Sequence, residues 1–128
     1  MDKSKQQKTV LIVEDETDLS QVLSEKVGEA GFNILTASNG EEGKKIALEK
    51  HPDLILLDIL MPVMDGITML AELRKDSWGS LVPVILLTNL SDQKDIHEAG
   101  ELGVKNYLVK SDWKISEVAG KVKAALNE

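Results

Sequence analysis

The chain contains no cysteine, which excludes disulfide bridges, thiolate metal sites and thiol catalysis. Aromatic residues make up only 3% of the chain, too few for the stacking platforms that bind nucleic-acid bases. No apolar run approaches the roughly 20 residues of a membrane-spanning helix. The formal net charge of −7 argues against a general nucleic-acid binder, which usually presents a basic patch. We therefore expect no membrane partner and no direct contact with nucleic acid.

The length of 128 residues suits one domain with a core of its own. Residues 1–7 are polar and carry lysines, without the apolar centre of a signal peptide, so we expect a cytoplasmic protein with a flexible N-terminal arm. No linker or repeat interrupts the rest. We expect one domain over residues 1–128, with no output domain visible.

Apolar runs of strand length alternate with amphipathic segments along the whole chain. The patterns predict strands at 9–14, 33–37, 54–58, 83–88 and 106–109. They predict helices at 17–30, 66–75, 92–102 and 114–126, and a short helix that follows the turn at 38–40 and ends at Lys50. Successive strand–helix units with right-handed crossovers predict an α/β fold, a three-layer α/β/α sandwich around a parallel sheet.

Most of these strands end on residues that can bind a metal or a phosphate. The first ends at Glu14 and Asp15, the third at Asp58, the fourth at Thr88 and the fifth at Lys110. Because the carboxyl ends of parallel strands share one edge of a sheet, where ligands bind in such folds, we expect these side chains to converge. Taken singly, each has an ordinary alternative as a solvated acid, a turn residue or a surface lysine.

The three carboxylates would repel one another strongly without a cation. In the doubly wound order 2-1-3-4-5, the first and third strands are neighbours. Two carboxylates about 4 Å apart repel by about 4 kcal/mol at an effective dielectric constant of 20. Lys110 offsets only part of this repulsion, and oxygen-only ligands favour Mg²⁺ or Mn²⁺. The sequence therefore predicts a divalent metal site at Glu14, Asp15 and Asp58.

Such a set of residues suits phosphoryl transfer to a carboxylate. An aspartate can act as the nucleophile and form an aspartyl-phosphate, and it is already ionised at pH 7. Phosphoryl transfer mainly needs positioning and charge stabilisation. Lys110 would contribute a point charge to one phosphoryl oxygen, and Thr88 a hydrogen bond to another.

The chain resembles the receiver domain of bacterial two-component response regulators, the CheY-like domains. The resemblance runs from about Lys8 to Leu126, and four motifs carry it: VLIVEDE at 10–16, LILLDILMPVMDG at 54–66, PVILLT at 83–88 and YLVK at 107–110. It implies a flavodoxin-like fold, in which the five-stranded parallel sheet has the order 2-1-3-4-5 that is already known for this family.

The resemblance also implies the roles of the acidic residues. Asp58 would accept a phosphoryl group from a sensor histidine kinase, a phosphotransfer protein or a small phosphodonor. Asp15 and Asp58 would bind Mg²⁺ directly, with Glu14 near it or bound through water, and the backbone carbonyl of Leu60 would complete the site. Pro62 and Gly66 would shape the adjoining loop.

The remaining implied roles concern signalling. Thr88 and Lys110 would contact the phosphoryl group, and Tyr107 would turn inward when Thr88 moves toward it, unless Tyr107 is simply a packed strand residue. The face formed by helix four, strand five and helix five would then switch and address an unknown downstream protein, with a phosphorylation-dependent homodimer as an open alternative. Such a domain is not an enzyme beyond Mg²⁺-dependent self-phosphorylation and slow self-dephosphorylation.

Several positions depart from the commonest pattern of the family. Leu60 and Leu90 are apolar where a polar side chain could orient attacking water, which predicts slow loss of phosphate. Asn89 is larger than the usual small residue. Ser111 stands where the family usually has a cis proline, so we expect either a trans bond in a rearranged loop or a strained cis bond, because a cis bond before a non-proline costs about 3–4 kcal/mol. Trp113 is expected to pack as a hydrophobic staple.

Three rival functions remain to be weighed. An aspartate-dependent phosphatase would usually carry a second Asp where this chain has Leu60. A flavin- or nucleotide-binding domain would need a glycine-rich loop after the first strand, where Glu14-Asp15-Glu16 stands. A degenerate receiver that acts only as a protein-interaction module is disfavoured by the complete set of Asp58, Thr88 and Lys110. The sequence does not identify the kinase, the stimulus or the target.

Overall fold

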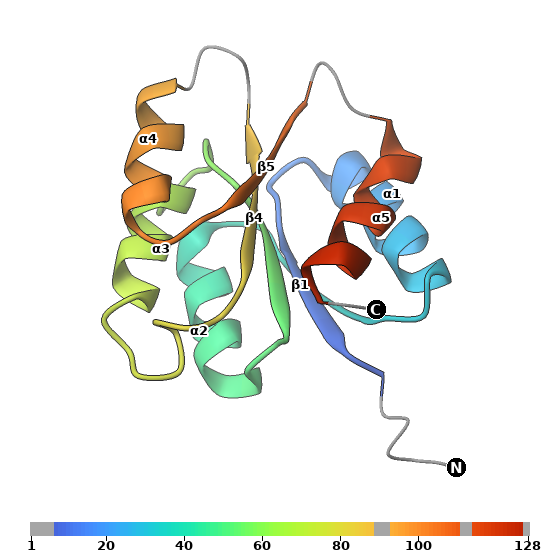
Figure 1. Ribbon diagram of the computed structural model, residues 1–128, viewed down its shortest axis with the longest axis horizontal. Helices are drawn as coiled ribbons and strands as arrows, with labels where there is room; N and C mark the ends of the chain where they lie inside the picture. Colours follow the sequence, from blue (N-terminus) through green and yellow to red (C-terminus); the bar gives the residue numbers. More distant parts are fainter. Residues whose placement is uncertain (1–6, 89–92, 111–113, 127–128) are drawn as a thin grey trace.

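The computed structural model describes residues 7–88, 93–110 and 114–126, and it has the predicted α/β architecture (Figure 1). Five parallel strands form one sheet in the order β2-β1-β3-β4-β5. The strands are β1 (Thr9–Val13), β2 (Asn33–Ala37), β3 (Leu54–Asp58), β4 (Val84–Thr88) and β5 (Asn106–Val109). The helices are α1 (Thr17–Glu29), α2 (Gly40–Lys50), α3 (Gly66–Leu73), α4 (Gln93–Glu101) and α5 (Ile115–Ala125).

The helices form a layer on each face of the sheet. Figure 1 shows α2, α3 and α4 on one face and α1 and α5 on the other. Successive side chains of a strand point to opposite faces of the sheet. Because helices cover both faces, the central strands are apolar on both. In β1, for example, Leu11 and Val13 pack toward α2 and α3, whereas Val10 and Ile12 pack toward α1 and α5.

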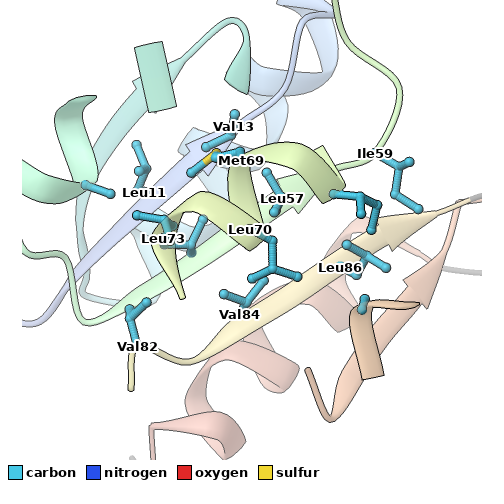
Figure 2. Close-up of a cluster of buried hydrophobic side chains, with 14 of the residues drawn as sticks. Leu11, Val13, Leu57, Ile59, Met69, Leu70, Leu73, Val82, Val84 and Leu86 are labelled. Atoms are coloured by element: carbon cyan, nitrogen blue, oxygen red, sulfur yellow. The ribbon is translucent and has the colours of Figure 1, made fainter. Parts of the chain in front are cut away.

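The core beneath α3 fixes the position of the strand ends that matter for function. Figure 2 shows Met69, Leu70 and Leu73 of α3 lying over the sheet residues Leu57 and Leu86, and all five side chains are fully buried. Burying a side chain of this size contributes about 1.5–3 kcal/mol. The strands β3 and β4 are therefore anchored along their length, and Asp58 and Thr88 are the last residues of these rigid elements.

The predicted elements are confirmed, with differences at their ends and on one helix face. The first strand ends at Val13, and the third helix ends at Leu73 rather than at residue 75. Within α1, Val22 is apolar but 38% exposed. The fully buried pair Leu23 and Val27 defines the centre of that face. At about 100° per residue, Val22 is turned away from Leu23 by roughly a quarter of the circumference.

Some predictions concern residues outside the described part of the chain. These are the arm at 1–6, the start of the fourth helix at Asp92, the residues Asn89 and Leu90, and the 110–111 peptide with Trp113. Within the described residues, none of the helices combines the length and the apolarity that a membrane crossing requires.

Candidate functional site

Three carboxylates meet at the carboxyl ends of β1 and β3. Val13 pairs with Leu57 in the sheet, so the residues that follow these two positions emerge side by side. One carboxylate oxygen from each of Glu14, Asp15 and Asp58 lies within 4.8 Å of the other two. Glu14 and Asp58 are buried, whereas Asp15 is exposed. The predicted convergence of the acidic residues is therefore present in the structure.

Lys110 joins this cluster from the end of β5. Its Nζ lies 3.0 Å from Asp58 Oδ1 and 3.3 Å from Glu14 Oε1. Its backbone N–H donates to the carbonyl oxygen of Thr88 over 2.6 Å, which continues the pairing of β4 with β5 beyond the last strand residues. This backbone hydrogen bond to β4 thus positions Lys110 so that its ammonium group lies beside Asp58 and Glu14.

Glu16 is an additional member that the sequence patterns did not single out. Its carboxylate lies 3.9 Å from Lys110 Nζ, and its backbone N–H donates to Glu14 Oε2 over 3.1 Å. The run of three acids at 14–16 was the available signal, but the pattern contained nothing to show that the third would face the lysine. Glu16 restrains Glu14 through its backbone and adds to the negative field at Lys110.

Burial and charge oppose each other at these groups. Burial raises the pKa of Glu14 to about 7, with the nearby Asp58 adding to this, while the Glu16 N–H and Lys110 act against it. Burial likewise raises the pKa of Asp58, although Lys110 and the N–H of Ile59, which donates to Asp58 Oδ1 over 2.9 Å, favour its charged form. Burial lowers the pKa of Lys110, but its ion pairs with Asp58 and Glu14 outweigh burial and leave that pKa raised.

The donor set fits a divalent cation of the hard, oxygen-binding class. Glu14 Oε1 is completely buried and accepts no hydrogen bond, so only the Lys110 ammonium compensates it within the described residues. Leaving a buried hydrogen-bond acceptor unpaired costs free energy. The other candidate ligands of the cluster, Asp15 and Asp58, also offer carboxylate oxygens. Mg²⁺ and Mn²⁺ prefer such ligands to nitrogen or sulfur.

The segment between β3 and α3 closes tightly against the cluster. The N–H of Gly66 donates to the carbonyl oxygen of Ile59 over 2.8 Å, and a Cβ at position 66 would collide with the carbonyl oxygen of Asp58. Asp65 caps α3, since its carboxylate accepts from the N–H of Thr68. Gly66 is therefore required by close backbone approach. Leu60 lies in this segment and is 62% exposed.

The two residues expected to act as a switch occupy different environments. Thr88 ends β4 and is 1% exposed, beside the cluster that Lys110 joins. Tyr107 in β5 is 46% exposed. Tyr107 lines a cavity of about 380 Å³ together with Val109 and the α4 residues Gln93, Ile96 and His97.

The sequence of this chain matches the family model of the response regulator receiver domain over residues 10–122. The chain belongs to the response regulator receiver domains. It is accordingly a CheY-like receiver of two-component signalling, a class whose members are generally not classical enzymes. Phosphorylation and Mg²⁺ binding are typical of this family.

Curated relatives of this receiver domain are transcriptional regulators. It is 38% identical to the "Probable transcriptional regulator ycf27" of Porphyridium aerugineum over 105 residues, which are 82% of the chain and 42% of that protein. It is 32% identical over 117 residues to the "DNA-binding dual master transcriptional regulator RpaA" of Synechocystis, covering 91% of the chain and 48% of that protein. The chain thus spans less than half the length of these relatives.

Solved structures confirm the receiver fold. The chemotaxis protein CheY4 of Vibrio cholerae superposes with a TM-score of 0.85 at 26% identity, covering 94% of this chain and 99% of that one. The receiver domain of a sensor histidine kinase from Pseudomonas aeruginosa, with a magnesium ion in its active-site cleft, also gives 0.85 at 26% identity and covers 96% and 100%. The family binds Mg²⁺ in its active site, and this receiver has an acidic cluster of the same chemical kind.

Proposed function

We propose that this receiver domain accepts a phosphoryl group on Asp58 and uses it as a signal. The observation that carries the proposal is the cluster itself: Asp58, Glu14 and Asp15 offer oxygens within 4.8 Å of one another, and Lys110 Nζ lies 3.0 Å from Asp58. Receiver domains interact with histidine kinases, so a sensor kinase or a phosphotransfer protein is the proposed donor.

The proposed metal ligands are the carboxylates of Glu14, Asp15 and Asp58 and the backbone carbonyl of Leu60. A bound Mg²⁺ or Mn²⁺ would supply positive charge toward the incoming phosphoryl oxygens. Asp15 is the exposed member of the set. A hydrated ion would therefore approach the two buried acids, Glu14 and Asp58, from the side of the cluster where Asp15 lies.

The remaining chemistry belongs to the side chains of the chain. A carboxylate oxygen of Asp58 attacks the phosphorus of a phosphohistidine, the P–N bond breaks, and the histidine leaves with the bonding electron pair. Lys110 then exchanges its ion pair with Asp58 for one with a phosphoryl oxygen. Thr88 donates its hydroxyl hydrogen to another. No general base is needed, because the nucleophile reacts as the carboxylate.

The proposed output surface is the face formed by α4, β5 and α5. Ala99 is the only α4 residue in the described part of that helix that is buried, so few apolar contacts hold α4 in place. The cavity beside Tyr107 provides space for that ring to turn inward when Thr88 moves toward the phosphate. This face would address the downstream protein or a second phosphorylated copy.

The relatives change what is proposed about partners. RpaA of Synechocystis is named a DNA-binding regulator. The expected absence of nucleic-acid contact is therefore not proposed for any longer protein that includes this domain. The cytoplasm is the proposed compartment, since response regulators typically act there. The extent of the domain, residues 1–128 with an arm at 1–7, stays a prediction.

Phosphorylation of the purified chain tests the proposal directly. Incubation with acetyl phosphate and Mg²⁺ should add one phosphoryl group by intact mass, and EDTA should prevent it. Asp58→Asn should abolish the mass increase. Asp53→Asn is the matched control, because Asp53 lies at the opposite end of β3, where its carboxylate accepts from Thr9 N–H.

The alternative of a degenerate receiver makes the opposite prediction. It requires no mass increase in the wild type and no Mg²⁺-dependent shift in the amide spectrum with beryllofluoride. Labelling that persists in Asp58→Asn would also refute the assignment of the acceptor.

A further inference from the structure

A second cavity opens at the other end of the sheet, among the residues that precede β4 and those that begin β5. Its volume is about 340 Å³, within the usual range of roughly 300–1,000 Å³ for small-molecule pockets. Val82, Pro83 and Asn106 line it, so it lies at the amino ends of these strands, whereas Thr88 and Lys110 lie at their carboxyl ends. The two sites are therefore at opposite ends of β4 and β5.

Arg74 contributes a half-buried positive charge to this cavity. Its Nε donates to the carbonyl oxygen of Leu102 over 2.7 Å, and its Nη1 donates to those of Gly79 and Val82 over 2.7 and 2.8 Å. Carbonyl dipoles orient the guanidinium but do not neutralise it. Burial lowers the pKa of Arg74, and no carboxylate in the described part of the chain offsets this, although buried charges are normally paired.

The outer nitrogen of Arg74 is left accessible by a glycine. Neither of the two donors on Nη2 has a hydrogen-bond acceptor among the described residues, in contrast to Nε and Nη1. Gly103 has a φ of +88°, and a Cβ built there would lie 3.8 Å from Nη2. A side chain at position 103 would therefore cover the guanidinium, and the glycine leaves that approach open.

The remaining walls divide into a polar and an apolar part. Lys105, Asn106 and Ser80 add a second cation and neutral polar groups. Leu81, which is 82% exposed, and Ala125 of α5 add apolar surface together with Val82 and Pro83. Among the described residues, neither cation has an acidic partner, and two such cations in a chain of net charge −7 favour a negative ligand. The apolar wall favours a ligand with a hydrocarbon portion.

We propose that this cavity binds a small organic anion whose carboxylate or phosphate lies against Arg74 Nη2 and Lys105 and whose apolar part lies against Leu81 and Pro83. A guanidinium nitrogen with two free donors suits an oxyanion better than a neutral ligand. The site does not depend on phosphorylation of Asp58, and it would give the domain a ligand input separate from its phosphoryl site.

Amide spectra of the ¹⁵N-labelled chain test this site with defined probes. Benzoate and phenyl phosphate carry both a charge and a ring, acetate and inorganic phosphate lack the ring, and benzyl alcohol lacks the charge. We expect saturable shifts at Gly103, Lys105 and Asn106 with benzoate or phenyl phosphate, at a Kd of about 1 mM. The small anions should bind more weakly, and benzyl alcohol should give no saturation. Whichever of the two ring-bearing anions binds more tightly assigns the headgroup.

Variants separate a specific site from general charge effects. Lys105→Gln should weaken binding about three- to fivefold, as expected for one partly solvated charge, and Lys105→Glu should weaken it further. Lys45→Gln, an exposed lysine of α2, is the matched control and should bind as the wild type does. Asp58→Asn should also bind normally, which separates this site from the phosphoryl site.

Three results would overturn the proposal. One is the absence of saturation at these amides with any anion up to about 50 mM, far above a millimolar Kd. Another is an equal loss of affinity in Lys45→Gln and Lys105→Gln, which would indicate non-specific screening. The third is binding of benzyl alcohol as tight as that of benzoate, which would leave no role for the two cations.

Discussion

Glu14 is the residue at which burial and charge conflict most strongly. It is 2% exposed and lies beside Asp58, and its one cationic neighbour among the described residues is Lys110, which it shares with Asp58. A carboxylate in such a place either takes up a proton or needs a further cation. This conflict is the physical reason to expect that metal binding and proton binding compete at this site.

Stability of the metal-free protein should reveal this conflict. Because the pKa of Glu14 is about 7 in the folded state and 4.5 ordinarily, the folded state binds the proton more readily. The stabilisation is complete below about pH 4.5 and is lost as pH rises through 7, a loss of about 3 kcal/mol. Urea unfolding in EDTA should therefore show a difference between wild type and Glu14→Gln that changes by this amount across the range. Parallel pH curves for the two proteins would refute it.

Leu60 is predicted to affect a different property, the lifetime of the proposed phosphoryl group on Asp58. Its exposed apolar side chain two residues after Asp58 offers no hydrogen bond to orient an attacking water. We expect Leu60→Gln to speed loss of phosphate about three- to tenfold, the equivalent of roughly one hydrogen bond in the transition state. The decay of ³²P-labelled protein measures this, with Leu60→Met as the apolar control. A half-life of seconds in the wild type, or no change in Leu60→Gln, would contradict this role.

At the scale of elements, the strands were the most predictable part of the molecule. β2, β3 and β5 have the predicted bounds, because turn signals on both sides of a short apolar run limit where the strand can begin and end. These strand bounds also fix where the two side chains lie, since Asp58 is the last residue of β3 and Lys110 directly follows β5. The loops were less predictable: the contact of Glu16 with Lys110 depends on how the β1–α1 segment folds over the sheet, and local sequence does not encode that.

The segment between β3 and α3 contains a strained backbone conformation that the sequence patterns did not predict. Val63 has a φ of +70°, which is unfavourable for a β-branched residue, and it is 75% exposed. The left-handed region costs an L-residue about 1–2 kcal/mol. Glycine avoids this cost, and the conformational entropy that a glycine loses on folding is a smaller penalty. The strain lies five residues from Asp58, in the loop that closes the acidic cluster.

Val63→Gly should therefore stabilise the protein by about 0.5–1 kcal/mol, because it removes strain and almost no buried surface. The free energy of unfolding in urea gives the measurement. Val63→Ala is the control: it keeps a Cβ in the left-handed region and should recover only part of the gain. A loss of stability in Val63→Gly would show that the Val63 side chain makes a contact worth more than the strain.

At the scale of the whole molecule, the acidic cluster and the Arg74 cavity lie at opposite ends of the central strands. Carboxylates gather at the carboxyl ends of β1 and β3, and the cations Arg74 and Lys105 gather at the amino ends of β4 and β5. The central strands β1, β3 and β4 are apolar except at their ends, and buried side chains pack on both of their faces. We therefore predict that a charge change at Asp58 affects α4, which has one buried residue in its described part, more than it affects the core.

Magnesium should stabilise the whole fold if it binds at the acidic edge, because a ligand that binds only the folded state shifts the unfolding equilibrium. At a free concentration of one hundred times its Kd, the gain is about 2.7 kcal/mol. We expect a rise in Tm with Mg²⁺ in the wild type, its loss in Asp15→Asn, and its retention in Glu49→Gln, an exposed acid of α2. The rise should be larger at pH 8 than near pH 6, since the protonated fraction of Glu14, whose pKa is about 7, must be displaced for the ion to bind. An equal rise in Asp15→Asn would place the ion elsewhere and remove the metal from the proposed site.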